Sequence, residues 1–469
     1  MSGEKQNNRL MTFVAPQPSR VMVAVTSAIN RLFMFNHVPV LDRIPFLNRI
    51  PGIVGLTRIK HVEIPKSSVA NFEEAVNDQT VAFIGPSHPE FFIDWMLDKT
   101  LSSRFAPMMA SWATHSIVNG MGQLAQWFWL KNNLIAQIPG AGGTAGKKFS
   151  VDWALKGHAV LLHPEGQVGW HGDQIAPLFP GIVDMAFEAA DQTCRTRHPR
   201  PVHILPVVWK MRFLDDVSAA LHREMAYVEK RLNMKDGQGL SIEKRLFEAQ
   251  CELLTRAERT WGRNSSGEGL PYAQRHAFLM DTLLGVAEAR LDLVGRALDV
   301  VVRTYLTRLE SQGRYSEFIS RLRRVERTAR ARRKAGEPVS EDTTRAIKTL
   351  QQLAMFMPEI YPGERVTQEN LAESIKRIRQ VYCRGTLRDE LNALLPRAAG
   401  PRVAHVRVAP ALNINAYWLK TVDAPQSKIA ETRQRIQDDL AKALDSTLDG
   451  LNTELETMKP PVSYANPFL

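Results

Sequence analysis

Short apolar runs alternate with helical stretches between residues 61 and 216, and this alternation constrains the fold more than any other feature of the sequence. The runs expected to form strands are residues 61–64, 80–85, 134–138, 159–162 and 202–208. Stretches that fit helices lie between or beside them, at residues 69–76, 89–99, 111–130 and 181–190. Strands that alternate with helices in this way are typical of an α/β sheet with parallel character.

Beyond residue 216 the pattern changes to one helix after another, as far as residue 400. The clearest apolar stripe has the spacing of one helix face and consists of Leu283, Ala287, Leu291, Val294, Leu298, Val301 and Tyr305. A β-like segment then returns, followed by a helix expected over residues 426–455. We therefore predict an α/β fold with a mixed sheet flanked by helices and a large all-α insertion. Its predicted parts are the core at 61–216, the insertion at 217–400, and the last core strand with the C-terminal helix at 401–458.

Residues 1–60 form a separate N-terminal segment, in which a proline recurs every six residues from Pro39 to Pro51. This interval excludes a regular helix and predicts a kinked apolar ribbon that carries Arg43 and Arg49. Two interpretations stay open: a strap packed on the core, or an amphipathic segment in the lipid interface whose arginines reach phosphates. No apolar run approaches the roughly 18 residues of a membrane-spanning helix. With no signal peptide expected either, we predict a cytoplasmic protein at the membrane periphery.

Composition and charge narrow the class of partner. A chain with 44% hydrophobic and 23% charged residues is not disordered throughout. Its three cysteines lie far apart without metal-ligand spacing, so we expect free thiols, no metal and no cofactor. The net charge of +11 favours a polyanionic partner, and the basic excess is concentrated at residues 303–334. That stretch is a solvated helix face, or it docks to an anionic membrane, an acidic carrier protein or RNA. We do not expect nucleic acid, because no nucleic-acid module is recognisable.

One motif that could carry chemistry lies where the strand at 80–85 ends and a helix is expected to begin. The carboxyl ends of strands are where α/β sheets present reactive groups. Ser87 and Glu90 form a capping-box pattern, which would put His88 at the mouth of the helix. A histidine that takes a proton from an alcohol needs a partner on its other ring nitrogen, and Asp94 offers a carboxylate. The alternative is a histidine in a tight turn with an unrelated aspartate.

A second motif begins with the apolar strand at 159–162, which runs into the turn His163-Pro164-Glu165-Gly166-Gln167. Glycine after a carboxylate lets the backbone approach a ligand closely, although an ordinary strand-ending turn is the alternative. Two further pieces follow, a Pro-Leu-Phe-Pro-Gly segment at 177–181 before a helix and an Ile-Leu-Pro-Val strand at 204–207.

Together these four pieces resemble the glycerolipid acyltransferase superfamily, the family of the lysophosphatidic acid (1-acylglycerol-3-phosphate) acyltransferases. In that family a His-x4-Asp motif follows a buried strand. A Phe-Pro-Glu-Gly-Thr-Arg segment, a Pro-Phe-x-x-Gly segment and an Ile-x-Pro-Val strand come later. The matching residues here occur in the same order: His88 with Asp94, then 163–166, 177–181 and 204–207. The resemblance covers about residues 60–215 and 401–457.

The resemblance implies an acyltransferase-like core and an O-acyltransferase of phospholipid biosynthesis. The enzyme would move a fatty acyl group from acyl-CoA or acyl carrier protein to the hydroxyl of a lysoglycerolipid-type acceptor at a membrane surface. His88 would be the general base and Asp94 would orient it. The implied substrate-binding residues are Ser87, Glu90, Pro164, Glu165, Gly166, Gln167 and Gly181. A non-catalytic descendant that binds lipid or acts as a scaffold is the alternative.

Two departures from the family pattern bear on this function. The spacing here is His-x5-Asp, and residues six apart on a continuous helix lie about 120° apart around its axis. Asp94 therefore reaches His88 only if the extra residue is absorbed before the helix or in a bulge, and otherwise Glu90 is the partner. Gln167 and Val168 also replace Thr-Arg, whose arginine typically grips the phosphate of the acceptor. Either the acceptor lacks a phosphate, or activity is lost, or another residue substitutes: Lys131, Lys147, Lys148 or His171.

Overall fold

The computed structural model divides the chain into two compact units. The first, called the sheet unit below, comprises Met1–Arg212 and Arg402–Met458, and the second, called the helical unit, comprises Phe213–Pro401 and Lys459–Leu469. The structure describes residues 13–35, 57–90, 93–137, 144–166, 168, 173–235, 237, 239–262, 270–293, 314–361, 363–394 and 398–468. Several residues named above lie outside this description: Arg43 and Arg49 with the proline-bearing ribbon, Gln167 and His171.

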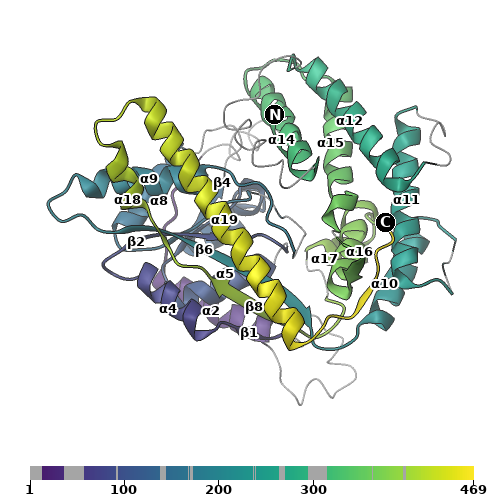
Figure 1. The fold of residues 1–469 in the computed structure, drawn as a ribbon, viewed down its shortest axis with the longest axis horizontal. Coiled ribbons are helices and arrows are strands. Elements are labelled where there is room, and N and C mark those ends of the chain that lie inside the picture. The colour runs from purple at the N-terminus through teal and green to yellow at the C-terminus, as the bar shows by residue number, and fades with distance from the viewer. Residues whose placement is uncertain are drawn as a thin grey trace. The chain divides into compact units, whose positions relative to one another are not determined.

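An eight-stranded sheet forms the centre of the sheet unit (Figure 1), with the order β1-β8-β6-β2-β5-β3-β4 and with β9 paired to β6. The strands are β1 (Ile59–Glu63), β2 (Val81–Pro86), β3 (Ala110–Thr114), β4 (Leu134–Gln137), β5 (Val160–Leu161), β6 (Val202–Phe213), β8 (Arg402–Val408) and β9 (Leu412–Asn413). β1 is parallel to β8. The pairs β6–β2, β2–β5, β5–β3 and β3–β4 are also parallel, whereas β9 is antiparallel to β6. The predicted α/β class, a mixed sheet flanked by helices, is confirmed at this level.

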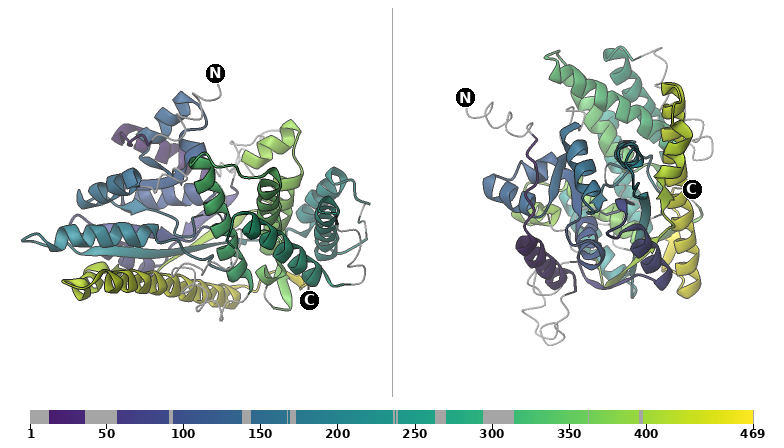
Figure 2. Two further views of the ribbon diagram at one scale, coloured as in Figure 1. Left: turned by 90° about the horizontal axis from the view of Figure 1, so that it is seen from above. Right: turned by 90° about the vertical axis from the view of Figure 1, so that its left-hand side faces the viewer.

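Burial explains why β2 is apolar throughout. All six of its residues are buried, with Val81 and Phe83 in the core on one face of the sheet and Ala82 and Ile84 in the core on the other. Successive side chains of a strand point to opposite faces, so a strand covered on both sides is apolar at every position. The covering helices are α4 (Lys66–Ala75) and α5 (Ile93–Phe105) on one face, and α8 (Thr144–Leu155), α9 (Gly181–Cys194) and α19 (Gln426–Met458) on the other. Figure 2 shows α19, in yellow, along one side of this unit.

Two expectations about the sheet unit are wrong. Instead of one helix over 111–130, the chain forms β3, the short α6 (His115–Val118) and α7 (Gln123–Lys131). β3 forms because β4 and β5 both pair with it, and Gly122, with a positive φ of 90°, separates the two helices. The helix expected from Pro89 begins only at Ile93, as α5. The remaining helices of this unit are α2 (Arg20–Phe35), α18 (Ile414–Trp418) and the 3-10 helix η3 (Leu419–Thr421).

The helical unit has its own apolar core, which contains Leu283, Ala287 and Leu291 of the predicted stripe. The other four stripe residues lie outside the described part of the chain. Its helices are α10 (Ser218–Arg231), α11 (Ile242–Thr260), α12 (Tyr272–Arg290), α14 (Arg314–Lys334), α15 (Glu341–Ala354), η2 (Pro358–Ile360), α16 (Gln368–Tyr382) and α17 (Leu387–Leu394). The unit is not all-α as predicted, because β7 (Arg365–Thr367) pairs antiparallel with β10 (Ser463–Ala465). β10 comes from beyond α19, so the pattern of residues 217–400 alone contains no sign of this pairing.

The described part of the basic stretch forms α14, and some of its charge is neutralised within the unit. Arg321 pairs with Glu288 at 2.8 Å and Arg332 pairs with Asp292 at 2.7 Å. These contacts agree with an ion-paired helix face, whereas docking of this helix to a membrane or carrier protein stays a prediction.

Candidate active site

His88 lies in the loop between β2 and α5, just beyond the carboxyl end of β2. Ser87 binds this loop to β6, because its N–H donates to the carbonyl oxygen of Val207 at 2.8 Å and its Oγ accepts the N–H of Trp209 at 3.4 Å. The Ser87 hydroxyl therefore extends the contact with the sheet, and the predicted capping box with Glu90 is wrong. The loop continues the direction of β2 before the chain turns into α5.

His88 and Asp94 are in direct contact, through Nδ1 of the imidazole and Oδ2 of the carboxylate. The extra residue of the His-x5-Asp spacing is absorbed before the helix, because α5 starts at Ile93 and Asp94 lies in its first turn. The backbone N–H of Glu90 donates to both oxygens of Asp94, at 3.2 and 3.1 Å. Trp209 donates its indole Nε1–H to Oδ1 at 3.0 Å. The carboxylate is thus held by donors from its own turn, from β6 and from His88.

The surroundings of His88 favour the unprotonated form of its imidazole. Burial lowers the pKa of His88 well below its usual value, and the positive charge of His163 lowers it further. Burial likewise raises the pKa of Asp94 well above the usual range, while His163 and the amide of Glu90 oppose that rise. The side chain of His88 is 20% exposed, and its Nε2 makes no hydrogen bond with any residue in the described part of the chain. With Nδ1–H directed at Asp94, Nε2 presents a lone pair to a substrate.

Glu165 fixes the backbone of His88 instead of facing open space. Its Oε1 accepts the N–H of His88 at 2.6 Å, its Oε2 accepts the N–H of Ala176 at 2.8 Å, and the residue is 1% exposed. The motif that follows β5 is therefore joined to the motif that follows β2 through one buried carboxylate. Glu165 thus fixes the backbone beside the imidazole of His88, and its expected contact with substrate stays a prediction.

Glu90 is not the partner of His88. Both of its carboxylate oxygens accept from Nη1 of Arg402, at 3.0 and 2.9 Å, and both side chains are buried. Arg402 also donates its Nε–H to the carbonyl oxygen of Thr57 at 3.1 Å. This arginine begins β8 and is separated from Glu90 by 312 positions, so no local pattern in the sequence points to the pair.

The turn at Gly166 requires glycine for two reasons. Its φ is +68°, and a Cβ added there would lie 2.5 Å from the ring of Phe179. Phe179 also donates its N–H to the carbonyl oxygen of Pro164 at 2.7 Å, which packs the 177–181 segment against this turn. The amide of Gly166 donates to the carbonyl oxygen of His163 at 3.1 Å. Gly181 is the first residue of α9.

Sequence reasoning missed His163 as a functional residue, although it stands in the second motif where the resembled family has phenylalanine. Its ring stacks on that of His88, with 4.1 Å between centroids and 17° between planes. Its Nε2 lies 3.0 Å from Oδ2 of Asp98, in α5. Burial disfavours the charged form, but the charge and hydrogen bond of Asp98, with the charges of Asp94 and Glu165, raise the pKa of His163 to about 9. The signal was present, because Asp98 follows Asp94 by four residues and so shares its helix face.

The lysines considered as substitutes for the family arginine are placed unequally. Lys131 precedes β4 and lies at the amino end of that strand, away from the end where His88 lies. Lys147 and Lys148 lie near the start of α8, at the carboxyl end of the sheet, but Nζ of Lys147 already pairs with Oδ2 of Asp184 at 2.6 Å. Among the residues that the structure describes, no group of three or more His, Cys, Asp or Glu side chains could hold a metal ion.

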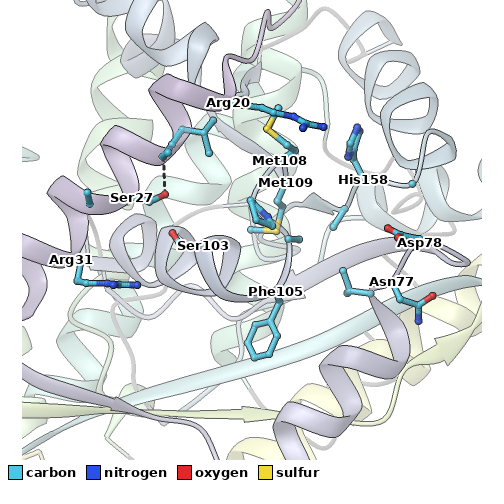
Figure 3. Close-up of a pocket in the computed structure, with 18 residues that line it drawn as sticks. Arg20, Ser27, Arg31, Asn77, Asp78, Ser103, Phe105, Met108, Met109 and His158 are labelled. Atoms are coloured by element: carbon cyan, nitrogen blue, oxygen red, sulfur yellow. Dashed lines mark hydrogen bonds between the residues drawn. The ribbon is translucent and has the colours of Figure 1, made fainter.

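Residues from several elements, Asn77, Asp78, Met109 and His158 among them, line a cavity of about 660 Å³ (Figure 3). Asn77 and Asp78 precede β2, Met109 precedes β3 and His158 precedes β5. These strands are parallel, so the cavity lies at their amino ends and His88 at their carboxyl ends. This cavity is therefore not the place where His88 meets a substrate.

No family model matched this chain in a comparison with known protein families, and no curated protein matched it either. Within the described ranges, none of the helices combines the length and apolar character needed to cross a bilayer.

Proposed function

We propose that this protein is an O-acyltransferase that moves a fatty acyl group from a thioester, acyl-CoA or acyl carrier protein, to the hydroxyl of a lysoglycerolipid-type acceptor. The observation that carries the proposal is the state of His88. Its Nδ1 is held by the buried Asp94, its ring is part-exposed, and its Nε2 is unbonded among the described residues. A general base needs this combination of a fixed tautomer and an available nitrogen.

In the proposed reaction, Nε2 of His88 accepts the proton of the acceptor hydroxyl while the oxygen bonds to the thioester carbonyl carbon. The carbon–sulfur bond then breaks, and protonated His88 returns the proton to the departing sulfur. The products are an ester and a free thiol, and no acyl-enzyme forms. Asp94 orients the imidazole throughout and balances the charge that His88 carries between the two proton transfers.

An exposed apolar stripe on α2 supports working at a lipid surface. Val21, Val25 and Ile29 follow one another at four-residue intervals and are 70%, 46% and 43% exposed. Such a row on a helix that also carries arginines at positions 20 and 31 suits the boundary between lipid tails and headgroups. We therefore propose peripheral association with the membrane from which the acceptor is drawn.

The test is a transfer assay on the full chain and on His88→Ala. Lysophosphatidic acid and monoacylglycerol are offered side by side in vesicles, each with acyl-CoA and acyl carrier protein thioesters, and released thiol and ester are measured. We expect the variant to lose roughly 10²–10⁴-fold in rate, the usual contribution of general acid–base catalysis. His198→Ala, which removes an exposed histidine of the same unit, is the matched control and should be unchanged. Turnover by His88→Ala near that of the wild type would contradict the assignment.

The placement of the lysines favours a second candidate, a lipid-binding protein of the same shape without catalysis. Lys131 lies at the wrong end of the sheet and Lys147 is already paired, so neither is an evident replacement for a phosphate-gripping arginine. If the wild type binds vesicles yet transfers no acyl group in any of the four substrate combinations, this candidate replaces the first. Transfer to monoacylglycerol alone would instead indicate an acyltransferase for phosphate-free acceptors.

A further inference from the structure

The hydrogen bonds of His163 determine its charge. Its Nδ1 lies 3.2 Å from the carbonyl oxygen of Pro86 and 3.1 Å from that of Ser87. A backbone carbonyl can only accept, so Nδ1 carries a proton. Its Nε2 lies 3.0 Å from Oδ2 of Asp98, and because an ionised carboxylate can only accept, Nε2 carries a proton beside it as well. An imidazole ring with both nitrogens protonated is a cation.

The groups that face this cation come from every element packed around it. α5 contributes Asp94 and Asp98, the end of β5 contributes Glu165, and the loop after β2 contributes His88. From β6 the neutral indole of Trp209 approaches its edge, with ring centroids 5.8 Å apart. The cation is thus surrounded by carboxylates on one side and covered by the candidate base on the other.

We propose that His163, held by Asp98, is a positioning residue whose fixed positive charge under the ring of His88 keeps His88 unprotonated before the reaction and makes it a ready proton donor afterwards. The first half of this statement stands on the hydrogen bonds of His163 and on the stacked rings, and the second half rests on the proposed function. Once His88 has taken the proton of the acceptor hydroxyl, two cationic rings lie face to face at 4.1 Å between centroids. Their repulsion favours release of that proton to the departing sulfur.

A phenylalanine, which the resembled family has at this position, would stack on His88 without supplying the charge. The histidine therefore adapts the site to acidic conditions, because a base next to a fixed cation stays unprotonated at lower pH. The raised pKa of His163, about 9, keeps the cation in place over the whole range in which His88 would otherwise titrate.

The experiment measures the protonation of His88 without any substrate. Diethyl pyrocarbonate reacts with unprotonated imidazole only, and mass spectrometry of the digested full chain reports modification at His88 and, as an internal reference, at the exposed His198. The first variant, His163→Phe, keeps a stacked ring under His88 but leaves the buried carboxylate of Asp98 without its partner. The double variant combines His163→Phe with Asp98→Leu and so removes that carboxylate as well. Circular dichroism establishes that each is folded.

We expect the reactivity of wild-type His88 to change by no more than about twofold between pH 8 and 5.5. In the double variant it should fall about threefold or more over the same range, because only burial then lowers the pKa of His88 below its usual value of about 6.5. The same dependence in wild type and double variant would overturn the proposal, and so would a tenfold fall in the wild type itself.

The pH dependence of His88 modification is independent of catalysis, because it can be measured even in a protein that transfers no acyl group. Where transfer is measured, kcat/KM of the double variant should lose about threefold or more between pH 8 and 5.5 while the wild type keeps its rate. A merely structural His163 would lower the rate of the variant equally at every pH, and that outcome would also overturn the proposal.

Discussion

Two regions in the described part of the sheet unit place a histidine against a carboxylate, and the two carboxylates differ in their other partners. At the carboxyl end of β2, His88 contacts the buried Asp94 and leaves its second nitrogen available. At the β1–β8 edge, Nδ1 of His405 contacts Glu63, but Arg407 shares that carboxylate and also pairs with Glu454. A histidine–carboxylate contact is therefore not a catalytic signature by itself, since the groups behind the carboxylate decide what it does.

The largest expected difference between the two regions is in transfer rate. Asp94→Asn keeps the size of the side chain but no longer holds the tautomer of His88, so we expect a loss of roughly 10³-fold in kcat. Glu63→Gln is the matched change at the other carboxylate and should leave kcat within about twofold of the wild type. Steady-state assays of both variants decide this, and an equal loss in the two would remove the distinction drawn here.

A second difference is in stability and contrasts two arginines. Arg402 and Glu90 are 5% and 7% exposed, so Arg402→Met leaves a buried charge unpaired and should cost about 3 kcal/mol of unfolding free energy. Arg407 faces Glu454, which is 45% exposed and stays solvated, so Arg407→Met should cost about 1 kcal/mol or less. Urea denaturation measures both. Recovery of stability when Glu90→Leu is added to Arg402→Met would identify the unpaired charge as the cause.

The last expected effect is the pH dependence of stability, to which His163 and His405 contribute with opposite signs. The pKa of His163 is raised in the folded state to about 9, so its stabilisation is complete below its unfolded value of about 6.5 and is lost as the pH rises through 9. The double variant without His163 and Asp98 should lack this loss of up to about 3 kcal/mol. Burial lowers the pKa of His405, although Glu63 opposes it, so its contribution weakens the fold as the pH falls. Thermal melts from pH 6 to 9.5 should show the loss in the wild type alone.

Much of the sheet unit was predictable from local pattern because its strands are buried on both faces. The runs at 80–85 and 202–208 contain β2 and part of β6, since a strand covered by helices is apolar at every position. The stretch 111–130 was misassigned because β3 pairs with strands that lie later in the chain, and pairing across the sheet overrode its helical pattern. Within the site, the order of motifs pointed to His88 and Asp94, and the structure brings them together.

The sequence by itself determined the alternation of strands and helices and the motifs at strand ends. Those features depend on near neighbours and on the apolar character of each segment. Only the tertiary structure decided that Glu90 pairs with Arg402, that Trp209 holds Asp94, and that His163 stacks on His88. The reason is physical: the charge on a buried ring is set by donors and acceptors that come from distant segments, and folding brings them within hydrogen-bonding distance.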